Sequence, residues 1–431
     1  MKCRHCACRL ELPLLELGSA PPSNAYLDAD ALDAPELWYP LRLLVCTGCW
    51  LVQTEDHAGR EALFGADYAY FSSFSSSWLT HARTYVEQVA QRFSLGPHSL
   101  VVEVAANDGY LLQYVQRLGI PCLGIEPTAG TAAAARARGL EIVERFFGVA
   151  LAQEMARNGQ RADLMVANNV LAHVPDINDF VAGFAAVLKP HGVATFEFPH
   201  LLSMVRGCQF DTAYHEHYSY LSLCSVQRIC AANGLVVFDV QDLGTHGGSL
   251  RVFTQRSDTG EQPITRAVGE MLARETRAGL QSSAFYAGFQ AQAARIKHAL
   301  LTFLLQAQRD GLTGAAYGAA AKGNTLLNFA GVRPDLVEFV VDRNPAKQGK
   351  FMPGSRIPIV AEAQLSTHRP DWVLVLPWNL RAEVATQLAY IAQWGGQFVT
   401  AVPRLETWAA GAALHGGGAG VGAPRRASLP A

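Results

Sequence analysis

Short apolar runs that end in small or polar residues alternate with amphipathic stretches along most of this chain. An amphipathic helix is expected over residues 77–93, and buried strands are expected over residues 99–105, 123–126, 162–169 and 193–197. Strands that alternate with helices are typical of a doubly wound parallel sheet. Two further strands after residue 235 are expected to pair in antiparallel fashion and to close this sheet.

A second unit of the same kind follows a long polar-faced helix that is expected over residues 275–310. Its predicted strands cover residues 314–318, 337–342 and 372–377, and a loop at 322–324 and a helix at 325–331 follow the first of them. The fold class is therefore α/β, and the predicted domains are residues 1–60, 61–250 and 251–408. Residues 409–431 are rich in glycine and lack an apolar pattern, which predicts a disordered tail.

Composition narrows the possible functions. A chain of 431 residues is longer than one hydrophobic core usually accommodates, which indicates two or three domains. The net charge of −2 provides no positive potential that would attract nucleic acid. We expect no signal peptide, and no apolar run approaches the roughly 18 residues that span a membrane. Five of the nine cysteines precede residue 50, which favours reduced thiols and metal ligands. These features predict a cytoplasmic protein.

Two Cys-x-x-Cys pairs lie near the amino terminus, and they consist of Cys3, Cys6, Cys46 and Cys49. Two such pairs allow four thiolates to converge on one tetrahedral Zn²⁺, and Gly48 permits the tight turn that this requires. The interval between the pairs is long, so Cys8 or His5 could replace one ligand. A redox disulfide is the alternative. Because no open coordination position is implied, the metal is expected to be structural.

The turn after the first strand of the middle unit indicates which cofactor binds there. A dinucleotide fold would use several glycines to approach a pyrophosphate, whereas Gly109 is the only glycine here. Asn107 and Asp108 suit a cationic nucleoside without phosphates, such as S-adenosylmethionine. Glu126 ends the next strand, where an acid commonly holds ribose hydroxyls, and Asn168 ends the third strand at the same rim.

Residues 214–218 contain two imidazoles, a carboxylate and two phenols. Each of these groups can hold or move a proton near neutral pH if its surroundings tune its pKa. A solvated polar turn is one alternative, and aromatic core packing is another. A metalloprotease site is excluded by spacing, because His215 and His217 lie two residues apart rather than four.

Five motifs occur in the order found in a known family: Glu103-x-x-x-Asn107-Asp108-Gly109, Asn169-x-x-x-His173-Val-Pro175-Asp176, Phe210-Asp-Thr-x-Tyr214-His-Glu216-His217-Tyr-Ser-Tyr220, Thr245-His246-Gly-Gly248-Ser249-Leu-Arg251 and Gly318-x-x-x-Lys322-Gly-Asn324-Thr-Leu-Leu-Asn328. Together with the cysteine pairs, these motifs resemble those of the NDP-sugar C-methyltransferases of deoxysugar and antibiotic pathways. The resemblance covers residues 3–405. It implies a small zinc-binding domain, a class I methyltransferase Rossmann-like middle domain and a Rossmann-like C-terminal domain.

The resemblance also implies a reaction. Members of the family methylate C-3 of a dTDP-4-keto-deoxysugar with S-adenosylmethionine, through an enolate that a base generates. By position, His217 resembles the base and Tyr214 and Glu216 resemble its partners, while Tyr68 and His173 resemble residues that line the sugar site and steady the oxyanion. The cofactor residues implied are Glu103, Asn107, Asp108, Gly109, Glu126 and Asn168.

Substrate contacts are expected from both Rossmann-like units, at His200, His246, Lys322 and Asn324. Lys322 at a helix start suits a diphosphate, although a solvated lysine is the alternative. His246 lies either in a plain hairpin turn or in a rim loop over the sugar. The expected partner is a small sugar nucleotide bound by a monomer or weak homo-oligomer, with no nucleic acid or membrane.

The chain departs from the class I methyltransferase pattern at Ala105, where glycine is usual. The loop at residues 317–324 also has fewer glycines than a Rossmann fingerprint. Two other functions therefore stay open. One is a C-, O- or N-methyltransferase that acts on a non-sugar small molecule. The other is a zinc-containing interaction module on a degenerate methyltransferase fold.

Overall fold

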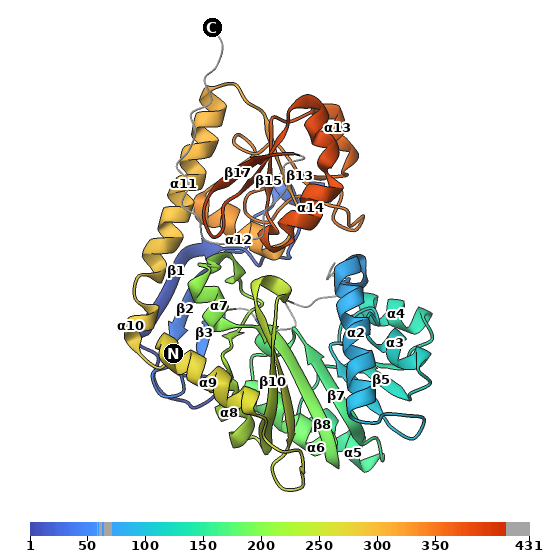
Figure 1. Cartoon of the computed structure of the whole chain (residues 1–431). Helices are drawn as coiled ribbons and strands as arrows, with labels where there is room; N and C mark the ends of the chain where they lie inside the picture. Colours follow the sequence, from blue (N-terminus) through green and yellow to red (C-terminus); the bar gives the residue numbers. More distant parts are fainter. Residues whose placement is uncertain (58, 60–62, 64–70, 411–431) are drawn as a thin grey trace.

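The computed structural model describes residues 1–57, 59, 63 and 71–410, and these residues build three sheets. The sheets have the strand orders β1-β2-β3-β9, β10-β11-β8-β7-β4-β5-β6 and β14-β13-β12-β15-β16-β17. In Figure 1 the six-stranded sheet lies above the seven-stranded sheet, and the amino-terminal strands run beside the junction of the two. The predicted α/β class, with its amino-terminal segment and two Rossmann-like units, is confirmed.

The seven-stranded sheet has parallel strands at its centre and an antiparallel pair at one edge. Its strands are β4 (Val101–Val104), β5 (Cys122–Ile125), β6 (Ile142–Val143), β7 (Ala162–Asn168), β8 (Leu188–Pro199), β10 (Leu235–Leu243) and β11 (Ser249–Arg256). The associated helices are α2 (Ser76–Arg92), α3 (Leu112–Arg117), α4 (Ala129–Ala137), α5 (Val149–Arg157), α6 (Ile177–Val187), α7 (Leu201–Arg206), α8 (Leu223–Ala232) and α9 (Arg266–Ala278). The helix expected over residues 77–93 corresponds to α2.

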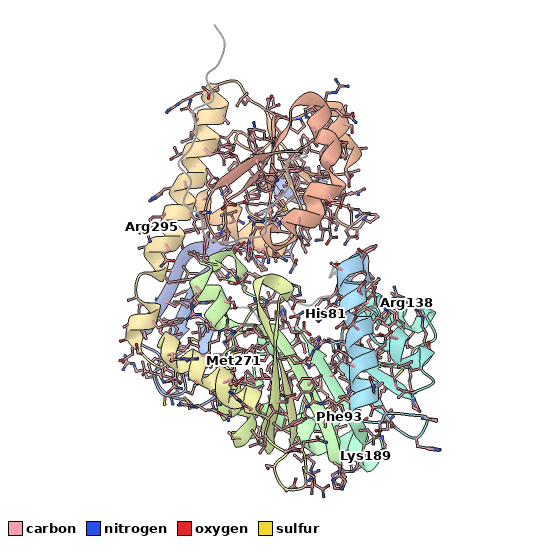
Figure 2. The ribbon with its side chains drawn as sticks, in the orientation of Figure 1. His81, Phe93, Arg138, Lys189, Met271 and Arg295 are labelled. Atoms are coloured by element: carbon pink, nitrogen blue, oxygen red, sulfur yellow. The ribbon has the colours of Figure 1, made fainter. Side chains whose placement is uncertain are left out.

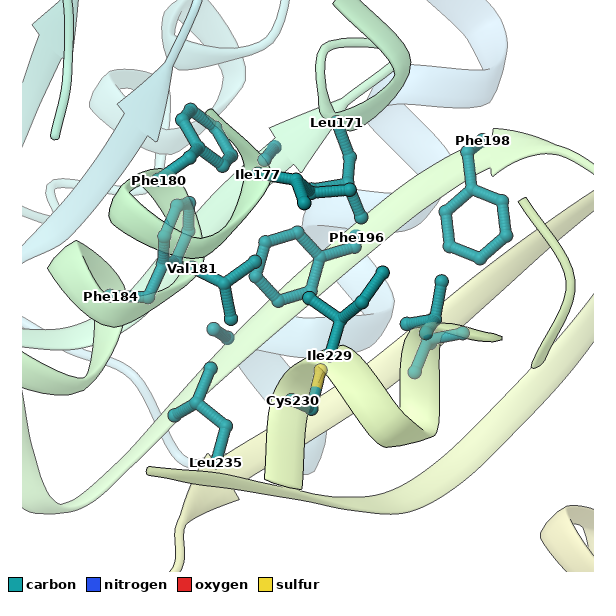
Figure 3. Close-up of a cluster of buried hydrophobic side chains, with 14 of the residues drawn as sticks. Leu171, Ile177, Phe180, Val181, Phe184, Phe196, Phe198, Ile229, Cys230 and Leu235 are labelled. Atoms are coloured by element: carbon teal, nitrogen blue, oxygen red, sulfur yellow. The ribbon is translucent and has the colours of Figure 1, made fainter. Parts of the chain in front are cut away.

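Side-chain alternation along β8 separates the core from the functional side of this sheet. Phe196 and Phe198 are fully buried among aromatic and aliphatic side chains of α6 and α8 (Figure 3). Successive strand residues point to opposite faces, so Thr195 and Glu197 face α2 instead. Thr195 Oγ1 lies 2.6 Å from the Tyr85 hydroxyl, and Glu197 contacts His81.

The amino-terminal sheet is completed by a strand from much later in the sequence. Its strands are β1 (Leu12–Ala20), β2 (Tyr39–Val45), β3 (Val52–Thr54) and β9 (Ser219–Tyr220). Strand β9 pairs with β3 in antiparallel register, with Tyr220 opposite Val52. The segment predicted to transfer protons is therefore paired directly with the amino-terminal sheet.

The six-stranded sheet is parallel except for its last strand. It contains β12 (Gly314–Tyr317), β13 (Val340–Val341), β14 (Ile359–Val360), β15 (Trp372–Val375), β16 (Gln397–Thr400) and β17 (Glu406–Ala409), with α12 (Ala321–Ala330), α13 (Ala363–His368) and α14 (Arg381–Gln387). Short 3-10 helices occur at η1 (Ala29–Asp33), η2 (Ser72–Phe74), η3 (Leu171–His173), η4 (Phe210–Thr212), η5 (Thr245–Gly247), η6 (Trp378–Leu380) and η7 (Ala389–Trp394).

Several predicted elements differ from the observed ones. The helix expected over 275–310 is three helices, α9, α10 (Ser283–Tyr286) and α11 (Phe289–Arg309), because Gly279 and Gly288 both adopt a left-handed φ of +86°. Lys322 and Asn324 lie in the first turns of α12 rather than in a loop. The strand expected over 337–342 shortens to β13.

The boundary predicted at residue 250 falls inside β11, and α9 packs against β10 beyond it. The predicted disordered tail covers residues 409–431, but Ala409 is the last residue of β17, and residues 411–431 lie outside the described residues. None of the helices in the described part of the chain combines the length and the apolar character that crossing a membrane requires.

Glu275 of α9 joins three separate segments of the unit built on the seven-stranded sheet. Its carboxylate accepts the backbone N–H groups of Leu223 and Cys224 at 2.7 and 2.8 Å, and His200 Nε2 lies 2.7 Å from it. The two N–H groups belong to the first turn of α8, where they have no partner inside the helix. A buried acid from another helix therefore caps α8 and holds His200.

Replacing Glu275 by alanine should lower the free energy of unfolding by about 3 kcal/mol, because it leaves buried donors without an acceptor. Thermal unfolding followed by circular dichroism would measure this effect. Glu270→Ala is the matched control on the same helix, since Glu270 is exposed and pairs only with exposed Arg266. The control should change stability by less than about 0.5 kcal/mol, and equal melting temperatures for both variants would contradict the assigned role.

Candidate active site

The turn after β4 is held in an unusual backbone conformation. Ala105, Asn107 and Gly109 have positive φ angles of 58°, 50° and 78°. The Glu126 carboxylate fixes this turn, because it accepts the backbone N–H groups of Asn107 and Thr128, both at 2.9 Å. Ala105 thus adopts the glycine-like conformation that the class I pattern would place here, at a cost of roughly 1 kcal/mol.

Two side chains at this rim have buried atoms available to a ligand. Both amide atoms of Asn168 and Oδ1 of Asp108 are buried and have no hydrogen-bond partner among the described residues. The other Asp108 oxygen accepts from Ser73 and from Arg138. An amide offers a donor and an acceptor, and with a carboxylate oxygen it fits the ammonium and carboxylate groups of S-adenosylmethionine.

Glu103 and Tyr110 form the floor beneath these atoms. Both side chains are buried, and burial raises the pKa of Glu103 well above its ordinary value, with further increases from Glu126 and Asp108. Burial therefore favours the neutral form of Glu103. Burial likewise raises the pKa of Tyr110. Burial thus disfavours negative charge on Glu103 and Tyr110.

His217 is held in a single neutral form. A backbone carbonyl can only accept, so the 3.0 Å contact with Thr212 O requires a proton on His217 Nδ1. Burial lowers the pKa of His217 well below its ordinary value, and His173, Lys322 and His246 lower it further. The unprotonated Nε2 then accepts a hydrogen bond from the Tyr214 hydroxyl at 2.7 Å.

The side chains next to His217 point to different parts of the molecule. His173 donates from Nδ1 to the Glu216 carbonyl at 2.8 Å and packs edge-on against His217, with ring centroids 4.6 Å apart. Burial lowers the pKa of His173 to about 4. The Glu216 carboxylate turns away and accepts two hydrogen bonds from Asn24, and burial raises its pKa. His215 faces the carbonyls that begin β2.

The turn between β10 and β11 brings His246 to the same region. Asn169 Nδ2 lies 3.1 Å from His246 Nε2, and both residues have positive φ angles, of 54° and 55°. Trp78 of α2 packs between His246 and His81, with ring-centroid distances of 5.2 and 5.0 Å. Figure 2 shows His81 on the side of α2 that faces this turn. His246 therefore lies in a packed rim rather than in a plain hairpin turn.

Buried Glu197 supports that rim. It lies 2.9 Å from His81 Nε2 and accepts a hydrogen bond from Arg251 at 2.6 Å. Burial alone would raise the pKa of Glu197, but His81 and Arg251 outweigh that effect and lower it. Thr245, which precedes His246, also donates to Glu197. The charge at the end of β8 thus fixes the turn that carries His246.

The C-terminal unit contributes a cation and an aromatic ring to the site. Lys322 Nζ donates to Asn379 at 2.8 Å and lies 4.8 Å from the centre of the Trp378 ring. Trp378 Nε1 donates to buried Asp211 at 2.7 Å. Burial raises the pKa of Asp211 to about 6 and lowers the pKa of Lys322. Trp378 also covers Gly247 so closely that a Cβ there would lie 2.6 Å from the ring.

The structure brings together most of the site residues predicted from the sequence, with three exceptions. The Glu216 carboxylate, predicted as a partner of His217, turns away to Asn24. His200 lies in the buried Glu275 network rather than beside His217, so its predicted substrate contact has no support. Tyr68 lies outside the described residues. Asn324 is buried with both amide atoms unpartnered among the described residues.

Several residues of the site were not predicted from the sequence: Asn24, Trp78, His81, Asp211 and Trp378. Asp211 lies within the motif at residues 210–220, but its residue type and position in the sequence predict no role for it. The other four lie 100 or more residues away from the elements they contact or belong to segments without a recognisable motif.

The amino-terminal cysteines form a compact cluster. The four sulfur atoms of Cys3, Cys6, Cys46 and Cys49 lie within 4.8 Å of one another. His5 instead contacts Asn178 at 2.8 Å, and Cys8 does not belong to this cluster. Four thiolates leave no open position on a tetrahedral metal ion, which suits structural zinc.

Comparisons with known proteins agree with this arrangement. Family models match residues 3–64 as a zinc binding domain, residues 78–240 as a methyltransferase domain and residues 244–403 as a C-methyltransferase C-terminal domain. The C-methyltransferase NovU from Streptomyces niveus is 33% identical over 402 residues, which are 93% of this chain and 95% of that protein. The chain belongs to the C-methyltransferase family.

Other similarities are confined to part of the chain. A ubiquinone biosynthesis O-methyltransferase from Methylobacterium sp. (strain 4-46) is 30% identical over 40% of this chain and 76% of its own length. The magnesium protoporphyrin IX methyltransferase of Synechocystis PCC 6803, solved with S-adenosylhomocysteine, shares 14% identity with a TM-score of 0.34, covering 42% of this chain and 83% of that one.

This C-methyltransferase uses S-adenosylmethionine and carries a zinc-binding domain. The predicted enzyme class and both predicted cofactors are thereby confirmed. The small-molecule substrate expected from the sequence is also consistent with the family.

Replacing Cys46 by serine should remove zinc from the purified protein and lower its melting temperature, because one of the four thiolates is lost and metal binding contributes to folding. Metal analysis by inductively coupled plasma mass spectrometry would measure the zinc content. Cys122→Ser is the matched control, since Cys122 lies in β5 and outside the cluster. Full zinc content in Cys46→Ser would show that this thiolate is not a ligand.

Proposed function

We propose that this C-methyltransferase methylates C-3 of a dTDP-4-keto-deoxysugar, and that His217 removes the C-3 proton. The observation that carries the proposal is the fixed neutral imidazole of His217, which lies among side chains from both Rossmann-like units. Its Nδ1 proton is committed to Thr212, so Nε2 is the atom that accepts a proton. The resemblance to NDP-sugar C-methyltransferases supports the choice of substrate.

The 4-keto group acidifies the neighbouring C–H bond. His217 Nε2 takes the proton, directly or through the Tyr214 hydroxyl that is bonded to it. The electron pair of the C–H bond becomes an enolate, whose carbon forms the new bond. Bound S-adenosylmethionine supplies the methyl group and leaves as S-adenosylhomocysteine. The proton remains on the imidazole, which returns it to solvent.

The low pKa of His217 has two opposing effects on this reaction. It keeps the ring unprotonated over the neutral range, but it also makes the ring a weaker base. The enolate therefore needs stabilisation from donors aimed at its oxygen, and such donors supply on the order of a few kcal/mol in buried sites. Tyr214 and His173 lie beside the base and can act in this way.

The nucleotide end of the substrate is assigned to the C-terminal unit. Strand β12 lies between β13 and β15, so the strand order reverses direction at β12 and β15, and ligands bind at the carboxyl ends of strands at such a point. Lys322 and Asn379 follow these two strands. A lysine at the start of the ten-residue helix α12 suits a diphosphate.

The backbone N–H of Ala319, in the loop after β12, is not available to bind a phosphate. It donates to Asp342 at 2.8 Å, and the Ala319 carbonyl accepts from Tyr26 and Lys347. Phosphate binding is therefore assigned to Lys322 and the α12 terminus, with the unpartnered amide of Asn324 nearby. This differs from a dinucleotide loop, in which free backbone amides bind the pyrophosphate.

Incubation of the enzyme with S-adenosylmethionine and a dTDP-4-keto-deoxysugar should give a gain of one methyl group by mass spectrometry. His217→Asn should abolish the gain, because asparagine cannot take the proton. His191→Asn is the matched control, since His191 is exposed near the start of β8.

In deuterated water without methyl donor, the wild type should exchange the C-3 hydrogen of the sugar for deuterium. Methylation without exchange would favour transfer to oxygen.

The dependence of activity on pH should reflect the low pKa of His217. The neutral ring is the active form, so kcat/KM should stay level as pH falls to 6.5 and should decline only at lower pH. An ordinary solvated histidine would lose half of its activity near pH 6.5. Initial rates of methyl transfer between pH 5 and 8, with stability checked at each pH, would measure this. A fall in kcat/KM with its midpoint at or above pH 6.5 would contradict the assignment of buried, neutral His217 as the base.

A further inference from the structure

The segment that precedes the catalytic cluster is held mainly by the C-terminal unit. Three contacts hold it. The Phe210 ring packs edge-on against the Phe329 ring, with centroids 5.5 Å apart. Asp211 accepts a hydrogen bond from Trp378 at 2.7 Å, and the Ala213 carbonyl accepts one from Thr325 at 2.8 Å. Phe329 and Thr325 lie on α12, and Trp378 follows β15. Residues 210–213 are thus attached to the C-terminal unit on both sides of Thr212.

Thr212 is the residue that orients His217. Its carbonyl accepts the Nδ1 proton at 3.0 Å, and its hydroxyl donates to the Gln209 carbonyl at 2.7 Å. Gln209 in turn donates to the Gly247 carbonyl, directly under the Trp378 ring. A displacement of Asp211 therefore changes the position of the one carbonyl that fixes the tautomer and the tilt of the imidazole.

We propose that Trp378 and Asp211 are positioning residues, and that their hydrogen bond lets the C-terminal unit set the orientation of His217. Asp211 is fully buried. One of its carboxylate oxygens accepts a hydrogen bond from Trp378 Nε1, and the other has no partner among the described residues. Loss of the indole N–H removes the Trp378 donor from this buried carboxylate, which keeps backbone contacts with Asp211 and Thr212, so the segment should shift to replace the lost hydrogen bond. The catalytic consequence rests on the proposed role of His217 as the base.

The same tryptophan links this contact to the predicted nucleotide site. Lys322 packs over the Trp378 ring and donates to Asn379, the next residue. A phosphate that binds Lys322 therefore touches the short segment that also holds Asp211. Binding of the nucleotide end and placement of the base are connected through two adjacent residues.

The ring nitrogens of histidine report this effect without any substrate. We would record ¹⁵N spectra of histidine side chains for the wild type, Trp378→Phe and Trp394→Phe, and assign His217 with His217→Asn. Trp394 is a matched control, because it also donates its indole N–H within the C-terminal unit, to the Pro370 carbonyl at 3.0 Å. Trp378→Phe should shift the His217 Nδ1 and Nε2 signals, and Trp394→Phe should leave them unchanged. Unchanged His217 signals in Trp378→Phe would overturn the proposal.

Asp211→Asn separates the hydrogen bond from the charge. Its amide oxygen still accepts from Trp378, so the His217 signals should remain close to those of the wild type. A shift as large as that in Trp378→Phe would mean that the charge of Asp211, rather than the hydrogen bond, controls the ring, and would overturn the proposal. Each variant also reveals through its remaining histidine signals whether the protein is folded.

Kinetics then test the catalytic consequence with the proposed substrate. Trp378→Phe should lower kcat on the order of ten-fold, with KM for S-adenosylmethionine unchanged, because small misplacements of a reacting group are costly. Trp394→Phe should keep the wild-type kcat. A wild type that is inactive on the sugar nucleotide would refute the proposed function alone, since the spectra of His217 do not depend on turnover. Wild-type kcat in Trp378→Phe, together with shifted spectra, would refute the positioning role in catalysis.

Discussion

The hydrogen bond from His217 Nδ1 to the Thr212 carbonyl is the constraint on which this site depends. It leaves a single ring nitrogen able to accept a proton, and it does so with a group that cannot change protonation state. Burial ensures that the ring stays neutral, because the charged form loses its hydration. Without this contact, the imidazole could present either nitrogen to the substrate, and the proton-accepting atom would not be defined.

This constraint explains why three sheets meet at one short segment. Residues 210–220 contact α12 and Trp378 at their beginning, His173 in their middle and β3 at their end. Apart from the two-residue strand β9 at its end, the segment has no strand or long helix of its own to hold it. Its geometry is therefore supplied by its neighbours, and each of the three structural units fixes a different part of it.

The buried ionisable groups are arranged so that few of them are charged without compensation. Glu103 and Glu216 have raised pKa values because of burial, and His173 and His246 have lowered ones for the same reason. Glu197 has a lowered pKa, and Arg251 balances its charge. Neutral acids and neutral imidazoles can donate and accept hydrogen bonds in a site where unpaired charges would be costly.

Local sequence was sufficient to predict the α/β class, the central strands of both Rossmann-like units, the four clustered cysteines and the residues near the turn after β4. These features depend on side-chain periodicity and on spacings of a few residues, which are visible in the sequence. The break at Gly279 and Gly288 was missed because a glycine within an amphipathic pattern does not reveal its φ angle. Only the tertiary structure decided that His200 pairs with Glu275, that Asp211 meets Trp378 and that His81 and Trp78 support the rim, since these contacts join residues 75 to 168 positions apart and depend on how the sheets pack.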